Sequence, residues 1–324
     1  MKAISTVIAS ILMLMITIAL GGTTYLYVSG VFTGKTATSF EIIDSINDTV
    51  TIRNSGTEPI TTFSSATLDG SSAVYRVSTQ DSALIAYWRF DEGFGSTVQD
   101  SSGSGNSGTI TGAGWRGGKF GSALDTTGSS QYAERDWPDF TVTTLTIEFW
   151  MNPDIVFGAI DGCIGNCYRD IVGIYGHDDR TRFHLEHVDN SIIWYGVYGA
   201  GNLDSNVIPT VGQWYHVVGT NDGTTARVYV NGELKNSGNR GASDTARSLV
   251  AGTDSEIFDG MIDEVKIYTR TLTEQEVRAS YNIGGQINPG QIATMKVYGL
   301  STKGTHTLRL CTSSICNTAY LTIN

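Results

Sequence analysis

The chain has 324 residues, which is long for one ordinary hydrophobic core and suits two domains with a further segment. It carries 21 lysines and arginines against 32 aspartates and glutamates, a formal net charge of −11. An acidic chain without a basic cluster would repel a phosphate backbone, so we expect no nucleic-acid partner. Its 38 glycines and 5 prolines are typical of many short strands joined by glycine-rich turns.

The N-terminal segment is the most apolar part of the chain. No charged residue lies between Lys2 and Lys35, and residues 4–32 are apolar or small. As a helix at 1.5 Å per residue, this stretch would be roughly 43 Å long, enough to cross a bilayer. Three interpretations are open: a secretory signal peptide cleaved near Gly21 or Gly22, a plain membrane anchor, or a leader of the pilin type. By the positive-inside rule, everything after Lys35 is expected outside the cell.

Residues 2–9, KAISTVIA, resemble the start of archaeal type IV pilins and archaellins. The resemblance implies a leader of residues 1–3, cut by a prepilin peptidase between Ala3 and Ile4, and a long hydrophobic α-helix over 4–35 that polymerises. Bacterial pilins carry an acidic residue at the fifth mature position, where this chain has Ile8, so the match is to the archaeal variety. Such a helix can span a membrane before assembly and form a filament core after it. The expected polymerisation core is Val7, Ile8, Ile11, Leu12, Leu14, Met15, Ile18 and Leu20.

After Lys35 the hydrophobic pattern changes to the alternation of β-strands. Each end of the chain has too few such segments to bury a core alone. We therefore predict that residues 36–82 and 285–324 fold together into a small β-sandwich head, with the middle inserted at a surface loop. The ordered segments RNSGTEPI, LDG, INPGQ, GTHTLRLC and AYLTI resemble the heads of archaeal pilins. Two unrelated tails around a central domain are the alternative.

Residues 83–284 carry an ordered set of motifs. They are IAYWRFDEG at 85–93, VQDSSGSGN at 98–106, GGKFGSAL at 117–124, LTIEFW at 145–150, QWYHVV at 213–218, ARVYVNG at 226–232 and FDGMIDEVKIY at 258–268. This order resembles the LamG-like, pentraxin-related jelly rolls of the concanavalin A type. The resemblance implies an inserted jelly-roll β-sandwich, so the predicted fold class is mostly β with a long N-terminal hydrophobic α-helix.

Local patterns inside the insert agree with this assignment. Residues 145–150 alternate as a half-buried strand does, and Asn231-Gly232 is a strong hairpin signal. Trp150 and Trp214 are expected between the two packed sheets. Residues 273–276, TEQE, fit a capping box that opens a short helix through about Ala279.

No enzyme is expected from the motifs. Glycosidases of this broad fold carry paired carboxylates on one strand face, and we identify no such strand in the sequence. The nearest acidic cluster, Asp259, Asp263 and Glu264, belongs to the closing motif of the jelly roll. A G-x-S-x-G elbow, an HExxH motif and a P-loop are also absent from the sequence.

The resemblance to LamG-like domains implies Ca²⁺ as a candidate cofactor. Asp100 and Asn106 lie in a Ser/Gly-rich loop and Asp263 lies in the closing motif, where oxygen ligands would be useful. The alternative is that Asp100 caps a turn and Asp263 binds backbone amides.

Candidate ligand-binding residues are His177 and Asp178, as a contact loop, and Trp194 and Tyr198, which could stack on a sugar face. A hairpin turn and a sheet core are the alternatives for the same residues.

The cysteines form two local pairs, Cys163–Cys167 and Cys311–Cys316, which in an exported protein predict disulfides closing small loops. A zinc site would need four converging ligands, and pairs almost 150 residues apart have poor spacing for one; free thiols are the remaining alternative. Asn47-Asp48-Thr49 is an N-glycosylation sequon.

The sequence therefore predicts a structural subunit of an archaeal type IV pilus-like extracellular filament that displays a LamG-like domain for adhesion or glycan binding. Its expected partners are copies of itself, the prepilin peptidase and membrane assembly machinery, and glycans or other cell surfaces. The alternatives are a membrane-anchored surface lectin or receptor that does not polymerise, and a secreted enzyme. The mature N-terminus separates them: Ile4 for the pilin, Met1 for the anchor and a residue near Gly22 for the secreted protein.

Overall fold

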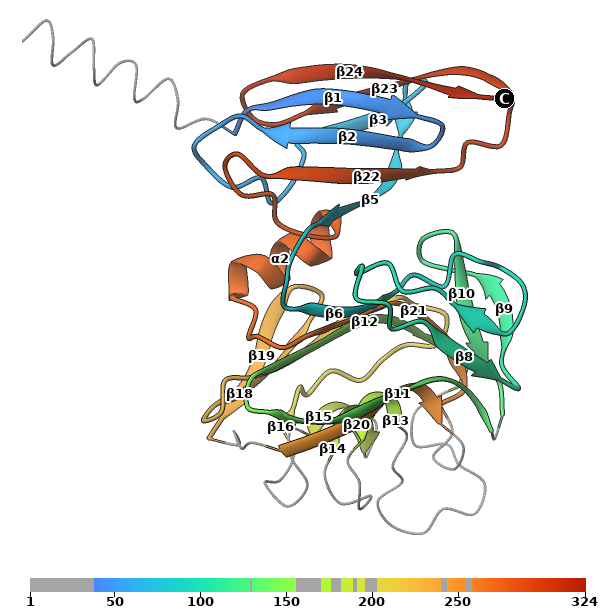
Figure 1. The fold of residues 1–324 in the computed structure, drawn as a ribbon, viewed down its shortest axis with the longest axis vertical. Helices are drawn as coiled ribbons and strands as arrows, with labels where there is room; N and C mark the ends of the chain where they lie inside the picture. Colours follow the sequence, from blue (N-terminus) through green and yellow to red (C-terminus); the bar gives the residue numbers. More distant parts are fainter. Residues whose placement is uncertain are drawn as a thin grey trace, which may run out of the picture.

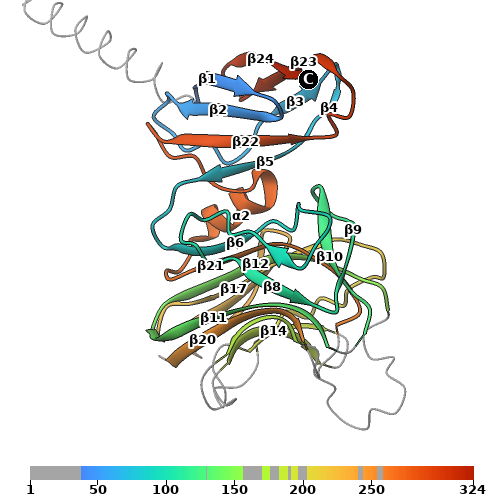
Figure 2. The same cartoon turned by 45° about the vertical axis from the view of Figure 1, so that its right-hand side comes forward.

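The computed structural model describes residues 38–128, 130–155, 170–175, 182–188, 191–195, 203–239, 244–253 and 258–324. Within these residues the protein is nearly all β, with one helix, α2 (Glu274–Ile283). Two β-sandwiches follow one another along the long axis of the molecule, and α2 lies between them (Figures 1 and 2). The smaller sandwich is called the head and the larger one the jelly roll.

The predicted fold class is wrong in one respect, the long hydrophobic α-helix. The helix that the described residues contain has ten residues and the mostly polar sequence EQEVRASYNI. Within those residues no helix has the length and the apolar character needed to cross a membrane. The predicted leader, cleavage site and polymerisation core all lie in residues 1–37, outside the described residues. The fold class is therefore that of a nearly all-β protein.

The head is built from both flanks of the insert. One sheet has the order β1 (Phe40–Ile46), β2 (Thr49–Asn54), β22 (Ile292–Tyr298) and β5 (Val74–Thr79). The other has the order β24 (Cys316–Ile323), β23 (Gly304–Cys311), β3 (Ser65–Leu68) and β4 (Ser71–Ser72). Each sheet thus pairs strands that precede the insert with strands that follow it. Alternating residues of both sheets form the core, among them Phe40, Val50, Ile52, Val77, Met295, Leu308 and Leu321.

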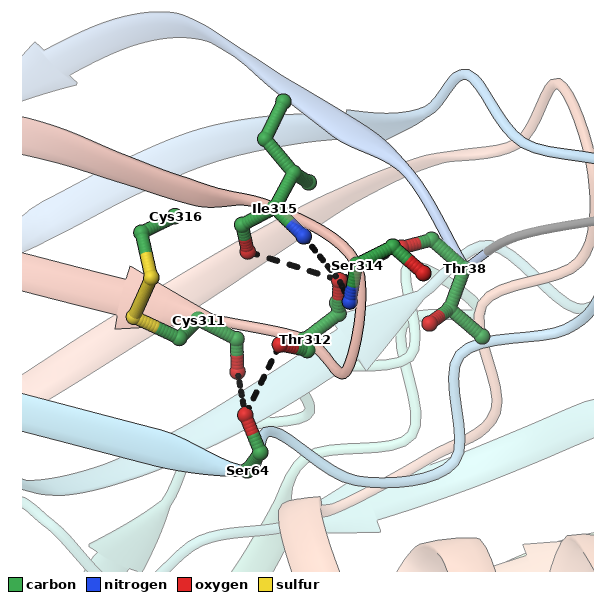
Figure 3. The surroundings of a disulfide bond; sticks show 7 residues. All are labelled: Thr38, Ser64, Cys311, Thr312, Ser314, Ile315 and Cys316. Atoms are coloured by element: carbon green, nitrogen blue, oxygen red, sulfur yellow. Dashed lines mark hydrogen bonds between the residues drawn. A yellow bond between two sulfur atoms is a disulfide. The ribbon is translucent and has the colours of Figure 1, made fainter. Parts of the chain in front are cut away.

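A disulfide closes the β23–β24 hairpin of the head (Figure 3). Cys311 and Cys316 are bonded with an S–S distance of 2.05 Å, as the sequence predicts. The hydroxyl of Ser64 lies 3.1 Å from the carbonyl oxygen of Cys311 and 2.8 Å from that of Thr312, which ties the hairpin to β3. The other predicted pair, Cys163–Cys167, lies outside the described residues.

The jelly roll consists of two sheets. The proximal sheet, next to the head, has the order β19 (Glu233–Gly238), β18 (Ala226–Val230), β17 (Tyr215–Asn221), β12 (Leu145–Pro153), β21 (Gly260–Tyr268), β10 (Ser122–Thr126) and β9 (Gly114–Gly117), and β6 (Leu84–Trp88) also pairs with β21. The distal sheet has the order β16 (Leu203–Asp204), β15 (Ser191–Tyr195), β14 (Arg182–Val188), β13 (Asp170–Tyr175), β20 (Asp244–Thr253), β11 (Gln131–Val142), β8 (Gly108–Thr111) and β7 (Thr97–Val98). The core between them includes Trp88, Trp137, Phe149 and Val217.

The central strands of the proximal sheet, β12, β17 and β21, are buried on both faces. All nine residues of β12 are buried, although the sequence predicts a half-buried strand there. Phe149 points into the jelly-roll core, whereas the next residue, Trp150, stacks on Tyr281 of α2 with ring centroids 5.6 Å apart. The predicted place of Trp150 between the two sheets is therefore wrong, because the strand alternation puts it on the face that α2 and the head cover. Trp214 is only partly buried and lies just before β17.

Helix α2 returns the chain from the jelly roll to the head. Its N-terminus has the predicted capping box, in which the Thr273 side chain and Glu276 bond each other's backbone amides. The helix ends at Gly284, whose φ of 103° is unfavourable for residues with a Cβ atom. A Cβ atom at Gly284 would lie 2.6 Å from the carbonyl oxygen of Val77, so glycine lets the helix end pack tightly against β5.

Candidate functional site

The outer face of the distal sheet is turned away from the head (Figure 1). Polar side chains and one tyrosine from β8, β11 and the residue before β8 lie together on this face. In β11 the strand alternation sends Ala133 and Trp137 into the core. Tyr132, Glu134 and Asp136 are therefore on the opposite, solvent-facing side. Strand β8 pairs alongside, with Thr111 opposite Tyr132 and Thr109 opposite Glu134. Two neighbouring strands thus present hydroxyl, carboxylate and aromatic groups side by side.

These residues line an open hollow of about 250 Å³, here called the distal hollow. Its lining is Ser107, Thr109, Thr111, Tyr132, Glu134, Arg135 and Asp136. An aromatic ring can pack on the apolar face of a sugar, while hydroxyls, carboxylates and a guanidinium pair with sugar hydroxyls.

The sequence interpretation overlooked this hollow. It identified no strand with paired carboxylates, yet Glu134 and Asp136 lie two residues apart on β11 and both line the hollow. The signal was present in the sequence, as alternate polar positions Tyr132, Glu134 and Asp136 in a run whose other positions include Ala133 and Trp137.

The second polar region lies where the jelly roll meets the head and is called the junction network. Glu148 of β12, Lys266 of β21 and Ser280 of α2 form its first part. The Lys266 ammonium lies 3.1 Å from the Glu148 carboxylate, 3.2 Å from the Ser280 hydroxyl and 2.6 Å from the Gly284 carbonyl oxygen. His216 Nε2 lies 3.3 Å from the same Glu148 oxygen. All three donors of the Lys266 ammonium are thus used inside the protein.

Burial acts to raise the pKa of Glu148, but Lys266, the nearby His216 ring and the hydrogen bond from Ser280 outweigh it and hold that pKa below its ordinary value. Burial lowers the pKa of His216, which favours the neutral imidazole. Glu148 and His216 are fully shielded from solvent. A general acid or base must reach a substrate, so this cluster is a structural joint rather than a catalytic site.

Arg76 of β5 and Glu264 of β21 form the other part of the junction network. Arg76 Nε donates to the Glu264 carboxylate at 3.1 Å, and the Tyr87 hydroxyl donates to the same oxygen at 2.5 Å. Arg76 also donates to the Ser280 carbonyl oxygen at 2.8 Å, so one side chain joins the head, β21 and α2. Glu264 lies at a register shift between β12 and β21 and has a φ of 55°, typical of a β-bulge that re-aims a side chain.

The residues around Asp100 do not fit a Ca²⁺ site. Its Oδ1 accepts hydrogen bonds from the backbone amides of Tyr87 and Ser102, each at 2.9 Å. Its Oδ2 accepts from the Ser102 hydroxyl and the Asn106 amide, each at 2.8 Å. Burial acts to raise the pKa of Asp100, but these bonds lower it. The carboxylate therefore organises the Ser/Gly-rich loop, as the alternative in the sequence analysis holds.

The surroundings of Asp263 do not fit a Ca²⁺ ligand either. One of its oxygens accepts a hydrogen bond from the Phe120 amide at 3.0 Å, and its side chain is buried. Burial and the neighbouring Glu264 raise the pKa of Asp263 well above its ordinary value, which favours the protonated acid. In the part of the chain that the structure describes, no three His, Cys, Asp or Glu side chains are grouped to hold a metal ion.

The remaining predicted site residues are distributed as follows. Asn47 lies exposed in the tight turn between β1 and β2, where a sequon is accessible. Trp194 lies on β15, paired with Leu203 of β16 and Leu185 of β14. His177, Asp178 and Tyr198 lie outside the described residues.

Comparisons with known proteins bear on the jelly roll. Residues 126–278 match the family model of the concanavalin A-like lectin/glucanases superfamily. Among curated proteins none matches the chain significantly. Domain 4 of AbnA, a GH43 extracellular arabinanase from Geobacillus stearothermophilus solved in complex with arabinotriose, is 23% identical with a TM-score of 0.50. That match covers 61% of this chain and 98% of the arabinanase domain.

Two toxin binding domains have the same fold. The binding domain of Paraclostridial Mosquitocidal Protein 1 is 16% identical with a TM-score of 0.50, and the match covers 62% of this chain and 52% of that one. The botulinum neurotoxin serotype G binding domain is 18% identical with a TM-score of 0.50, and the match covers 61% of this chain and 50% of that domain. This chain thus spans about half the length of either toxin domain, and the likeness is one of fold. The middle of the chain therefore has the LamG-like, concanavalin A-like jelly-roll fold.

Proposed function

We propose that the jelly roll binds a glycan in the distal hollow and that the head holds this binding domain at the cell surface. The observation that carries the proposal is the lining of the hollow, in which Tyr132 lies beside the hydroxyls of Thr109 and Thr111 and the carboxylate of Glu134. The arabinanase domain of the same fold was solved with arabinotriose, which supports an oligosaccharide as the ligand class. The disulfide Cys311–Cys316 supports an oxidising, extracellular location.

The position of the hollow suits display. The distal sheet is on the side of the jelly roll away from the head (Figure 1). The hollow is lined by residues of this sheet, so a glycan on another surface can reach it without meeting the head. The junction network buries Arg76, Glu264, Glu148 and Lys266 between the two sandwiches. Such a network resists bending between head and jelly roll and keeps the hollow pointing outward.

Substitution of Tyr132 tests the binding function. We expect Tyr132→Ala to weaken binding of arabinotriose or another oligosaccharide found in a glycan screen by about tenfold, because the stacking face is removed. The matched control is Tyr320→Ala, since Tyr320 is an exposed tyrosine of β24 in the head. Isothermal titration calorimetry of both variants measures the change. Equal affinities for the two variants would reject the distal hollow as the binding site.

A second candidate function, hydrolysis of a glycosidic bond, is favoured by the paired carboxylates Glu134 and Asp136 on one strand. The same oligosaccharides separate the two functions. Release of new reducing ends by the native protein, abolished in Glu134→Gln, would assign hydrolysis. Binding without release would assign recognition alone.

We further propose that the chain is a subunit of a surface filament, exposed outside the cell. The head, assembled from both flanks of the insert, supports this finer assignment, as does the resemblance of residues 2–9 to the pilin leader. N-terminal sequencing of the protein from its source cells is the first test, with Ile4 as the expected residue. Electron cryomicroscopy of sheared filaments is the second. Filaments that lack the chain, together with Met1 or a residue near Gly22 at its N-terminus, would reject the proposal.

A further inference from the structure

A cleft of about 620 Å³ separates the head from the jelly roll and is here called the interdomain cleft. Strands β5 and β22 of the head line one side, and β6, β21 and the loop at Ser101–Ser102 line the other. The volume is in the range of about 300–1,000 Å³ typical of small-molecule sites, which occur preferentially at domain interfaces. The cleft is separate from the distal hollow, which lies on the other sheet of the jelly roll.

The charge of the cleft is opposite to that of the whole protein. Arg89, Lys266 and Lys296 line it, and no aspartate or glutamate is among the described residues of its lining. The chain as a whole has a formal net charge of −11. A concave, cationic surface on an acidic protein concentrates small anions from solution.

The three cations differ in how far the protein already satisfies them. Lys266 uses its three donors on Glu148, Ser280 and Gly284, and Lys296 pairs with Asp91 at 3.0 Å. Arg89 instead makes one side-chain hydrogen bond to the described residues, from Nη2 to the neutral Ser78 hydroxyl. Among those residues it forms no salt bridge, although the charges of Glu264 and Asp91 act to raise its pKa.

The guanidinium of Arg89 is positioned by an aromatic ring. It lies over the ring of Tyr87, 4.9 Å from the ring centroid, and that ring is itself buried. An arginine has five N–H donors in a planar fork that matches a carboxylate bidentately. Arg89 is therefore a positioned cation with unused donors facing a cleft.

The rest of the lining suits a polyhydroxylated molecule. Ser78, Thr79 and Thr294 supply hydroxyls from the head, and Leu84 supplies an apolar contact from the jelly roll. Ser78 and Thr294 are register partners on β5 and β22, so their side chains lie together on the sheet face beside Arg89. We propose that the interdomain cleft binds a carboxylate-bearing saccharide of the uronate class, with its carboxylate on Arg89 and its hydroxyls on the head strands.

The two sandwiches contribute different parts of this site. The cation comes from the jelly roll and most of the hydroxyls come from the head, so the site exists only while the two are joined. The inference goes beyond glycan binding in the distal hollow and does not depend on it.

Galacturonate and galactose are the probes, because they differ only in whether C6 is a carboxylate or a primary alcohol. We expect the full-length chain to bind galacturonate at least tenfold more tightly than galactose in ligand-observed NMR or calorimetry, with affinity falling as salt is added. Arg89→Gln should weaken galacturonate binding by about tenfold or more, and Arg89→Lys should weaken it less.

A second variant keeps the test independent of any effect of Arg89 on folding. Thr294 is exposed on β22, so Thr294→Asp should fold normally while its new carboxylate competes for Arg89 and reduces galacturonate binding. Thr318→Asp, at an exposed threonine of β24, adds the same charge away from the cleft and should leave binding unchanged. Tyr132→Ala, in the distal hollow, should also leave it unchanged.

The proposal is overturned if neither probe binds, if both bind equally, or if Thr294→Asp and Thr318→Asp behave alike. Loss of galacturonate binding in Tyr132→Ala with retention in Arg89→Gln would also overturn it and would place the anion in the distal hollow instead. Failure of oligosaccharide binding in the distal hollow would leave the result for the cleft unaffected.

Discussion

Replacing Lys266 by methionine should destabilise the joint between the sandwiches strongly. Methionine keeps an unbranched apolar side chain of similar length but removes the ammonium that contacts Glu148, Ser280 and Gly284. The Glu148 carboxylate would then remain fully buried without its cation. It would have to be protonated, or to stay charged in a medium that solvates it poorly.

The magnitude follows from the burial of the pair. Side-chain exposure is 3% for Lys266 and 0% for Glu148, so solvent cannot compensate for the lost partner. Removing one member of a buried ion pair costs about 3–5 kcal/mol of unfolding free energy. A surface pair offers the matched control, because Lys235 lies 2.7 Å from Glu233 but the side chain of Glu233 is 72% exposed. Lys235→Met should therefore cost about 0–1 kcal/mol.

Equilibrium unfolding in urea, followed by tryptophan fluorescence, measures both variants. Trp150 lies in the joint and should report its loosening, and two separate transitions would show that head and jelly roll unfold independently. The double variant Lys266→Met/Glu148→Gln should be more stable than Lys266→Met alone, because no charge is left unpaired. A loss for Lys266→Met no larger than that for Lys235→Met would refute the reasoning.

Two further changes probe the same region. Gly284→Ala should lower the thermal unfolding temperature more than Gly290→Ala does. Both glycines have positive φ, but only at Gly284 would the new Cβ atom meet a backbone atom, at 2.6 Å. Equal losses in the two variants would contradict this reasoning. Burial lowers the pKa of His216, which faces Glu148, Arg76 and Lys266, so the unfolded chain takes up a proton at higher pH than the folded one. Stability should therefore fall as pH drops below the ordinary histidine pKa of about 6.5. The measurement is the urea midpoint at a series of pH values for the native protein and for His216→Gln. If the midpoint of the variant falls with pH as steeply as that of the native protein, His216 is not the cause.

Strand alternation and the order of the motifs predict much of this fold correctly. Seven short motifs in order predict the inserted jelly roll, and alternating segments at both chain ends predict the strands of the head. The capping box at Thr273 is local and is therefore found without the structure. The burial of β12 is different, because Glu148 and Trp150 face a surface that exists only after the head has docked. From the sequence, the polar residue Glu148 in an alternating strand is expected to face solvent, whereas in the fold it belongs to a buried ion pair.

The candidate sites show the same limit. Asp100 is acidic and lies in a Ser/Gly-rich loop, which suggests calcium, but its four acceptor positions are taken by nearby amides and a hydroxyl. Hydrogen bonds of that kind depend on the loop conformation and are not visible in residue types. Arg89 belongs to a motif that the sequence assigns to the jelly roll, and its closeness to Ser78 of the head follows only from the docking of the sandwiches.

The way in which the chain enters and leaves the jelly roll has a mechanical consequence. It leaves the head at the end of β5 and returns at the start of β22, and these strands are neighbours, with Thr79 opposite Ala293. A pull on the jelly roll is therefore shared by two covalent connections anchored in one sheet, instead of falling on a single tether. Two adjacent connections also oppose twisting, so a chain of this design can carry load without turning the outer face of the jelly roll away.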